Sequence, residues 1–187
     1  ALAHGGPAAY VARPCQFTDS STAQGCHVAY WTTHRYAPEV VDGMNRAVDD
    51  LKRRSGARRV VLVGYSGGGA VAALLAARRD DVAGLVTVAA NLDLDDWVRR
   101  DGLAPLTGSL NPADQASALR GLPQVHFVGR RDGVVAPDVV RSFLVRLNSP
   151  ATARLVEMDD FDHHCCWVRS WPDLVRRPEL GIIGGWN

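Results

Sequence analysis

The chain has 187 residues, of which 47% are hydrophobic and 22% charged, and its formal net charge is +1. This length suits one domain with a sizeable core, and the composition is typical of soluble globular proteins. So small a net charge gives no long-range attraction to nucleic acid or to an anionic membrane, and we expect neither partner. No apolar run approaches the roughly 18 residues that a membrane span needs, so we expect no span.

The first part of the chain predicts a short strand over residues 9–12, followed by a polar loop between Cys15 and Cys26. A disulfide that closes a loop of this length stabilises a fold by roughly 3 kcal/mol through chain entropy, and such bonds persist in oxidising compartments. We therefore predict a Cys15–Cys26 disulfide and an exported protein, periplasmic or extracellular. Two ordinary buried thiols and a cytoplasmic protein are the alternative.

A helix is predicted over residues 38–54, where apolar side chains recur at helical spacing after Pro38. The apolar run 60–63 then predicts a buried strand, and the small residues of 70–77 predict a helix. Between them lies Gly64-Tyr65-Ser66-Gly67-Gly68, a sharp turn with a serine at its centre. Such a turn exposes the serine hydroxyl at the end of the sheet, and the next helix directs its positive end toward that hydroxyl.

This turn has the Gly-x-Ser-x-Gly pattern of a nucleophile elbow, which presents a catalytic serine. A glycine-rich turn between a strand and a helix also binds phosphate in nucleotide-binding folds, and a plain turn is the third interpretation. The glycine spacing here is not Gly-x-Gly-x-x-Gly, and no Gly-Lys-Ser/Thr follows. The sequence therefore favours Ser66 as a nucleophile.

The rest of the chain alternates between predicted strands and helices. Strands are expected over residues 82–90, 124–129 and 153–158, and helices over 139–147 and 167–176. This alternation predicts an α/β fold in a single domain, with a mainly parallel sheet and helices on both faces. Residues 91–122, punctuated by proline and glycine, are expected to form a short cap over an open site, and residues 177–187 a loose tail.

Two predicted strands are followed by residues that suit a role beside Ser66. Asp132 comes just after strand 124–129, where an acid is placed to orient a histidine, and the histidine pair at 163 and 164 follows strand 153–158. Asp132 also suits a turn with the glycine that follows it. Asp138 is the other candidate acid, but its place after a proline favours the first turn of a helix.

The order of serine, acid and histidine, each just after its own strand, resembles the α/β-hydrolase superfamily over roughly residues 8–176. The resemblance implies a serine hydrolase of the esterase or lipase kind. Ser66 would attack an ester-like carbonyl, His163 would transfer the proton, and Asp132 would fix the imidazole. The backbone N–H of Gly67 would be one donor of the oxyanion hole.

His163 is favoured over His164, because the residues from His164 onward look like the start of a helix. The resemblance further implies a truncated fold in which residues 8–16 form the family's fourth strand and the strands before it are lacking. His4-Gly5 is like the motif that carries the second oxyanion donor, but strand 9–12 follows too soon to admit the intervening helix. The second donor is therefore left unassigned.

The sequence leaves the substrate open among esters, thioesters, amides and lactones, and it leaves the oligomeric state open. We expect a small-molecule, ester-like substrate and neither a metal nor a cofactor, since the cysteines lack Cys-x-x-Cys spacing. An acyltransferase or peptidase with the same residues is one alternative, and a non-catalytic binding protein on the same scaffold is another. For Cys165 and Cys166, a vicinal disulfide and two thiols both remain open.

Overall fold

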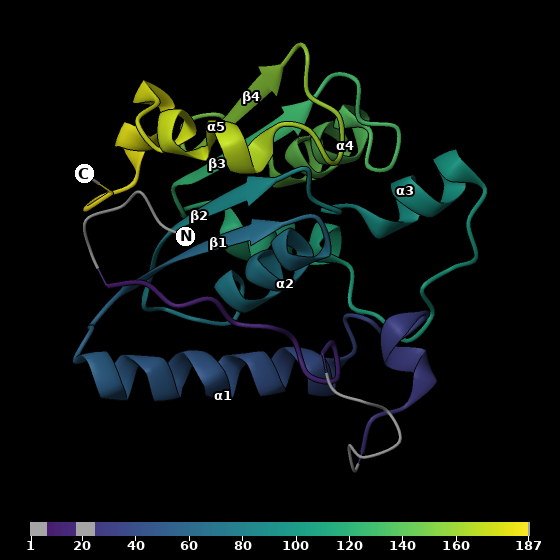
Figure 1. Cartoon of the computed structure of the whole chain (residues 1–187), viewed down its shortest axis with the longest axis horizontal. Helices are drawn as coiled ribbons and strands as arrows, with labels where there is room; N and C mark the ends of the chain where they lie inside the picture. Colours follow the sequence, from purple (N-terminus) through teal and green to yellow (C-terminus); the bar gives the residue numbers. More distant parts are fainter. Residues whose placement is uncertain (1–6, 18–24, 187) are drawn as a thin grey trace.

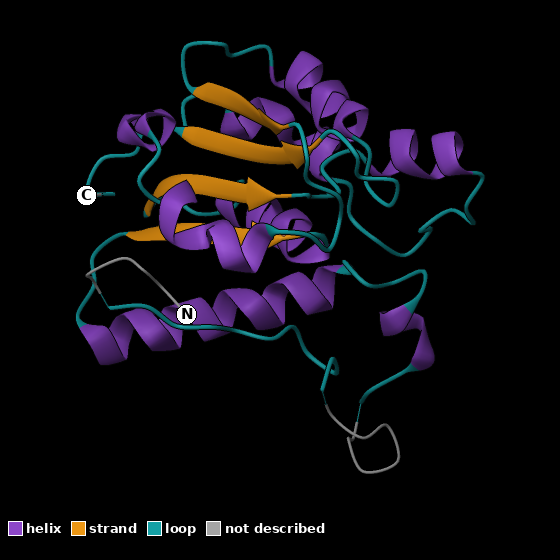
Figure 2. Ribbon diagram, turned by 45° about the horizontal axis from the view of Figure 1, so that its top comes forward, coloured by secondary structure: helices purple, strands orange, loops and turns teal. Residues whose placement is uncertain are grey.

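The structure is a computed structural model that describes residues 7–17 and 25–186, so the His4-Gly5 motif lies outside the described residues. Within them, four parallel strands form one sheet in the order β1-β2-β3-β4 (Figures 1 and 2). The strands are β1 (Val60–Tyr65), β2 (Val82–Val88), β3 (Gln124–Gly129) and β4 (Ala153–Met158). Each pairs in parallel with the next in the chain.

Helices cover both faces of this sheet, which confirms the predicted α/β fold class. The α-helices are α1 (Pro38–Ser55), α2 (Gly67–Ala76), α3 (Leu94–Asp101), α4 (Pro137–Leu147) and α5 (Trp167–Leu174). The described residues also contain three 3-10 segments, namely η1 (Val28–Trp31), η2 (Pro112–Leu119) and η3 (Pro178–Ile182). The side chains of α2 and α4 share one core with η2, whereas α5 and η3 pack on the opposite face.

The burial of the two middle strands explains why β2 is an almost continuous apolar run and why the polar side chains of β3, Gln124 and His126, are buried as well. β2 and β3 are buried along their whole length, because each has helices above and below it. Leu85 and Val128 face the core with α2 and α4, while Val86 and Phe127 face α5. Parallel sheets buried on both faces commonly have this composition.

Residues 8–16 do not form the expected fourth strand, and this prediction was wrong. The segment 7–17 runs beside α1 without pairing in the sheet (Figure 1). Arg13 holds it by donating from Nη1 to the carbonyls of Tyr30, at 2.6 Å, and Arg35, at 3.0 Å. Pro14, which has no N–H to donate to a neighbouring strand, instead packs on Gly43 of α1.

Residues 177–186 pack on the sheet and do not form the expected loose tail. Leu180, Ile183 and Trp186 are all buried against β2 and β3. Gly84 of β2 creates the space, since a Cβ there would lie 2.5 Å from Cγ2 of Ile183. A contact between a glycine and a residue 99 positions later leaves no trace in local sequence pattern.

The predicted cap, residues 91–122, is more ordered than its weak periodicity suggested. It contains α3, whose N-terminus is capped by the side chain of Asp93, and η2, which packs against α4. Leu92, Leu94 and Trp97 are buried and contribute to the core rather than to an open surface. Among the described residues, no helix is both long and apolar enough to cross a membrane.

Candidate active site

The turn after β1 holds Ser66 in a backbone conformation that few side chains adopt. Its φ of 51° and ψ of −125° lie outside the regions favoured by L-residues. The turn is held by the Ser66 N–H, which donates to the carbonyl of Val88 at 2.8 Å. Gly64 and Gly69 permit the geometry, because a Cβ on either would overlap the Gly68 carbonyl or the Ala90 methyl group. The structure thus forms the strand–turn–helix unit that the sequence predicts.

Ser66, His163 and Asp132 lie in one chain of hydrogen bonds. The Nε2 atom of His163 is 3.0 Å from Oγ of Ser66, and its Nδ1 atom is 2.8 Å from Oδ2 of Asp132. The side chains of His163 and Asp132 are buried. The three residues come from the turns after β1, β3 and β4, which all end at the same edge of the parallel sheet.

Both carboxyl oxygens of Asp132 have hydrogen-bond partners. Its second oxygen, Oδ1, accepts from the backbone N–H of Val134 at 2.9 Å and of Val135 at 2.8 Å. These bonds fix the carboxylate while leaving Oδ2 for the imidazole. The sequence left two alternatives for Asp132, a turn-forming residue and a partner of the histidine. Its side chain makes both kinds of contact, one with each oxygen.

The two competing candidates have other partners. Asp138 lies in the first turn of α4, where Arg141 and Arg100 bind its carboxylate and Arg141 lowers its pKa. His164 is exposed, and its backbone N–H donates to Asp162 rather than to the site. Its ring stands edge-on to that of His163, with 5.4 Å between the ring centroids.

A sequence model described as the alpha/beta hydrolase fold matches residues 15–153 of the chain. The chain belongs to the α/β-hydrolase family. No curated protein sequence matches the chain, whereas many solved structures resemble it.

Three solved structures illustrate how far this likeness of α/β-hydrolase folds extends. An esterase from Pyrococcus furiosus is 18% identical, with a TM-score of 0.63 over 80% of this chain and 63% of its own. An α/β-hydrolase from lagoon-sediment metagenome is 22% identical, with a TM-score of 0.54 over 72% and 65%. An acylaminoacyl peptidase from Pyrococcus horikoshii is 13% identical, with a TM-score of 0.62 over 74% and 26%. The chain therefore spans less than two thirds of each of these proteins.

Tyr65 occupies the first variable position of the Gly-x-Ser-x-Gly motif and contacts His163. This contact was not anticipated from sequence. The Tyr65 hydroxyl donates to the carbonyl of His163 at 2.5 Å, and the two ring centroids are 5.3 Å apart. Partial burial, together with the charges of Asp132 and Asp162, raises the pKa of Tyr65, so the hydroxyl keeps its proton. Nothing in a Gly-x-Ser-x-Gly pattern assigns a role to this position, because its partner lies 98 residues away.

The N-terminus of α2 provides the expected position for an oxyanion donor. Gly67 is the first residue of the helix, where backbone N–H groups have no partner inside the helix. The buried side chain of Tyr36 reaches this point, since a Cβ on Gly67 would lie 2.6 Å from the Tyr36 hydroxyl oxygen. Tyr36 is a second neighbour of the site that sequence reasoning missed.

The cysteines fall into two pairs. Cys15 and Cys26 have sulfur atoms at disulfide distance and Cα atoms 5.7 Å apart, which suits the predicted bond. Cys165 and Cys166 are adjacent in the turn that carries His163. In the part of the chain that the structure describes, no three His, Cys, Asp or Glu side chains cluster in a way that would hold a metal ion.

Proposed function

We propose that this protein is a serine hydrolase that cleaves an ester-like bond through an acyl-enzyme. The hydrogen-bonded chain from Ser66 through His163 to Asp132 carries the proposal, because it joins a nucleophile, a base and an orienting acid in the geometry of acyl transfer. The esterases among the structural neighbours are consistent with this class, although a shared fold does not define an activity.

In the proposed mechanism, Nε2 of His163 accepts the proton as Oγ of Ser66 attacks the carbonyl carbon. Asp132 holds Nδ1 protonated and stabilises the imidazolium that results. The Gly67 N–H and the positive end of α2 stabilise the oxyanion. His163 then protonates the leaving group, and a water molecule activated by the same nitrogen releases the acyl group.

The substrate in this proposal is a small ester-like molecule that enters an open site. Tyr65 and Val134 support an apolar acyl or aromatic group, because they are 45% and 43% exposed beside Ser66 and Asp132 in the chain. With an alcohol or amine instead of water as the acceptor, the same residues would catalyse acyl transfer. A protein that only binds such ligands would keep the fold without the reaction.

A fluorophosphonate probe and a p-nitrophenyl ester test the proposal together. The wild-type protein should be labelled at Ser66 and should release p-nitrophenol. Ser66→Ala should abolish labelling and lower kcat by at least about 10⁴-fold. Ser55→Ala, at the exposed end of α1, is the matched control and should behave like wild type. Equal labelling of wild type and Ser66→Ala would reject the nucleophile and favour the binding protein.

A further inference from the structure

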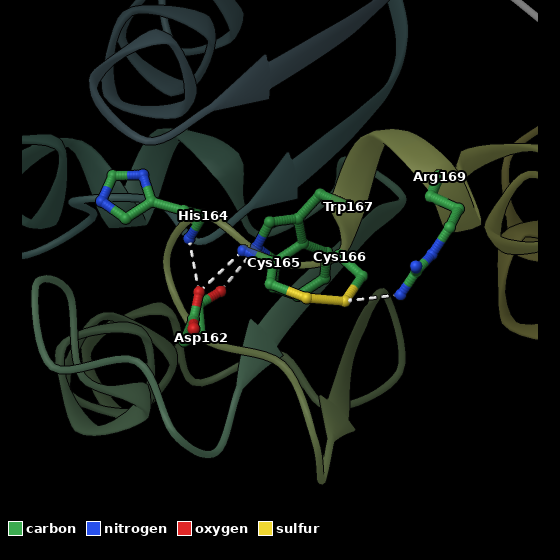
Figure 3. The surroundings of a disulfide bond; sticks show 6 residues. All are labelled: Asp162, His164, Cys165, Cys166, Trp167 and Arg169. Carbon is green, nitrogen blue, oxygen red and sulfur yellow. Dashed lines mark hydrogen bonds between the residues drawn. A yellow bond between two sulfur atoms is a disulfide. The ribbon is translucent and has the colours of Figure 1, made fainter.

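Cys165 and Cys166 form a disulfide in the structure (Figure 3). They directly follow His163 and His164 in the sequence. Neither has a part in the proposed hydrolysis. Cys165 is exposed, while Cys166 is half-buried at the N-terminal cap of α5. The pair is therefore open to a thiol that arrives from solvent.

The two sulfur atoms differ in their surroundings. Nη2 of Arg169 lies 3.1 Å from Sγ of Cys166 (Figure 3). Cys166 is also at the positive end of the α5 dipole. A guanidinium and a helix N-terminus both stabilise a thiolate, so negative charge is better stabilised on Cys166 than on Cys165. Cys166 is therefore the better leaving group of the pair.

We propose that Cys165–Cys166 is a site of thiol–disulfide exchange, opened by a dithiol reductant that attacks Cys165, and that its state controls the position of His163. The exchange chemistry does not depend on the proposed hydrolase function. Only its consequence for the rate of hydrolysis rests on that function.

The exchange proceeds in two steps. A thiolate of the dithiol attacks Sγ of Cys165, the bond to Cys166 breaks, and its electron pair leaves on Cys166 beside Arg169. The second thiolate of the reductant then attacks the reductant's other sulfur, which is bonded to Cys165 in the mixed disulfide. Cys165 is released and takes up a proton. The dithiol is thereby oxidised to a disulfide, its other proton passes to water, and the protein gains two electrons.

Hydrogen bonds from Asp162 close the turn that contains both this pair and His163. Oδ1 of Asp162 accepts from the N–H groups of His164 and Cys165, both at 2.7 Å, and these bonds lower its pKa (Figure 3). The Asp162 N–H donates to the Cys165 carbonyl at 2.9 Å, and Trp167 donates to the Asp162 carbonyl at 2.9 Å. His163 lies inside this closed turn. Opening the disulfide leaves the peptide bond as the one covalent link between Cys165 and Cys166. The turn thereby loses the side-chain constraint that holds its backbone next to His163.

The first experiment measures exchange directly. Non-reduced protein is incubated with dithiothreitol, and thiols are trapped with a maleimide and located by peptide mass. Label should appear on Cys165 and Cys166 before Cys15 and Cys26. Arg169→Gln should slow the reduction roughly three- to fivefold. Arg176→Gln, an exposed arginine just beyond α5 that pairs with Asp173, should match wild type.

Two results would overturn the exchange site. Free thiols at Cys165 and Cys166 in non-reduced protein, trapped under denaturing conditions, would show that the pair is not a disulfide. Equal reduction rates for wild type, Arg169→Gln and Arg176→Gln would remove the proposed role of Cys166 as the stabilised leaving group.

The second experiment follows His163 by NMR, a signal that does not depend on hydrolysis, and then measures the rate of hydrolysis beside it. In protein labelled with ¹⁵N-histidine, the resonances of the His163 ring nitrogens should shift on reduction. In the variant Cys165→Ser/Cys166→Ser, the same resonances should not respond to the dithiol. The wild-type kcat for a p-nitrophenyl ester should fall about tenfold on reduction, because a displaced base loses its alignment. Unchanged His163 resonances in fully reduced wild type would refute control of the site. An inactive wild type whose His163 resonances still shift would count against the hydrolase alone.

Discussion

His163 depends on three separate groups for its position, each from a different part of the sequence. Asp132 binds Nδ1, the Tyr65 hydroxyl binds the main-chain carbonyl, and the turn closed by Asp162 fixes the backbone. The imidazole is thus held by both its ring and its peptide group. In the proposed mechanism, this fixed geometry lets His163 accept the proton without a prior rearrangement.

Asp132→Asn tests which acid orients this histidine. An amide at this position can present its NH₂ group to Nδ1, which stabilises the wrong tautomer. We expect kcat to fall about 10⁴-fold with little change in KM. Asp138→Asn is the matched control, since it alters the other candidate acid on the surface of α4, and should retain activity. Loss of activity in Asp138→Asn alone would contradict our assignment.

Among the described residues, His126 is the other buried histidine, and its hydrogen bonds give it a structural role. Nε2 of Gln124 donates to the Leu119 carbonyl, so Oε1 of Gln124 accepts from His126 Nε2, and His126 Nδ1 accepts from Thr87 at 2.8 Å. The neutral imidazole therefore has both its hydrogen bonds. Burial lowers its pKa from 6.5 to about 3, because a charged ring would be desolvated.

This histidine should make the protein less stable in mild acid. Between pH 6.5 and about 3 the unfolded chain binds a proton at His126 that the folded protein does not. Stability contributed by the neutral ring is therefore complete above pH 6.5 and falls by up to about 1.4 kcal/mol per pH unit below it. Urea unfolding across this range should show a shallower pH dependence for His126→Asn than for wild type. Identical slopes would show that His126 does not titrate this way.

At the scale of elements, three strand ends supply the candidate site. Ser66 follows β1 directly, Asp132 comes three residues after β3, and His163 five residues after β4. Because all the strands run parallel, their carboxyl ends lie along one edge, and short turns are enough to bring the side chains together. β2 contributes through the Val88 carbonyl, which holds the N–H of Ser66.

The packing of the C-terminal segment on β2 and β3 should be important for stability. Ile183 is almost fully buried and fills the space beside Gly84. Ile183→Ala should lower the free energy of unfolding by about 2–5 kcal/mol, since it leaves a cavity in a packed core. Val168→Ala, which shortens a side chain 90% exposed on α5, should change it by less than about 0.5 kcal/mol. Equal, small effects in urea unfolding would support the loose tail instead.

At the scale of the whole molecule, the Cys15–Cys26 pair bears on both stability and compartment. The predicted bond would link Cys15, in the segment beside α1, to Cys26, just before η1. We propose that the protein is exported, because such a bond persists in oxidising compartments. The proposal of export therefore rests on this bond.

Cys15→Ala/Cys26→Ala tests this bond while leaving the pair beside His163 intact. Without the disulfide the unfolded chain is less restricted, so the free energy of unfolding should fall by about 3 kcal/mol. The melting temperature should then fall by roughly 6–12 °C in a protein of this size. The kcat should be retained, since neither residue bonds to Ser66, His163 or Asp132. Free thiols at both positions in non-reduced, denatured protein would refute the bond and favour the cytoplasm.

The sequence by itself determined the features that depend on neighbouring residues. Strand, turn and helix around Ser66 follow from an apolar run, a glycine-rich turn and small residues, all within about 20 positions. The strands before Asp132 and His163 follow from the short segments 124–129 and 153–158, in which apolar residues alternate with polar ones. Since parallel strands end at one edge, local patterns place the three residues at the same edge of the sheet, and the resemblance to α/β-hydrolases supplied the expectation that they act together.

Tertiary structure alone decided the features that join residues distant in the chain. The hydroxyl of Tyr65 reaches His163, Tyr36 reaches Gly67, and Ile183 occupies the space left at Gly84. Segment 7–17 lies beside α1 rather than in the sheet, because Arg13 and Pro14 find partners there. Periodicity and turn chemistry report only the preference of each segment, whereas a free-energy gain from packing depends on which distant surface the folded chain brings to it.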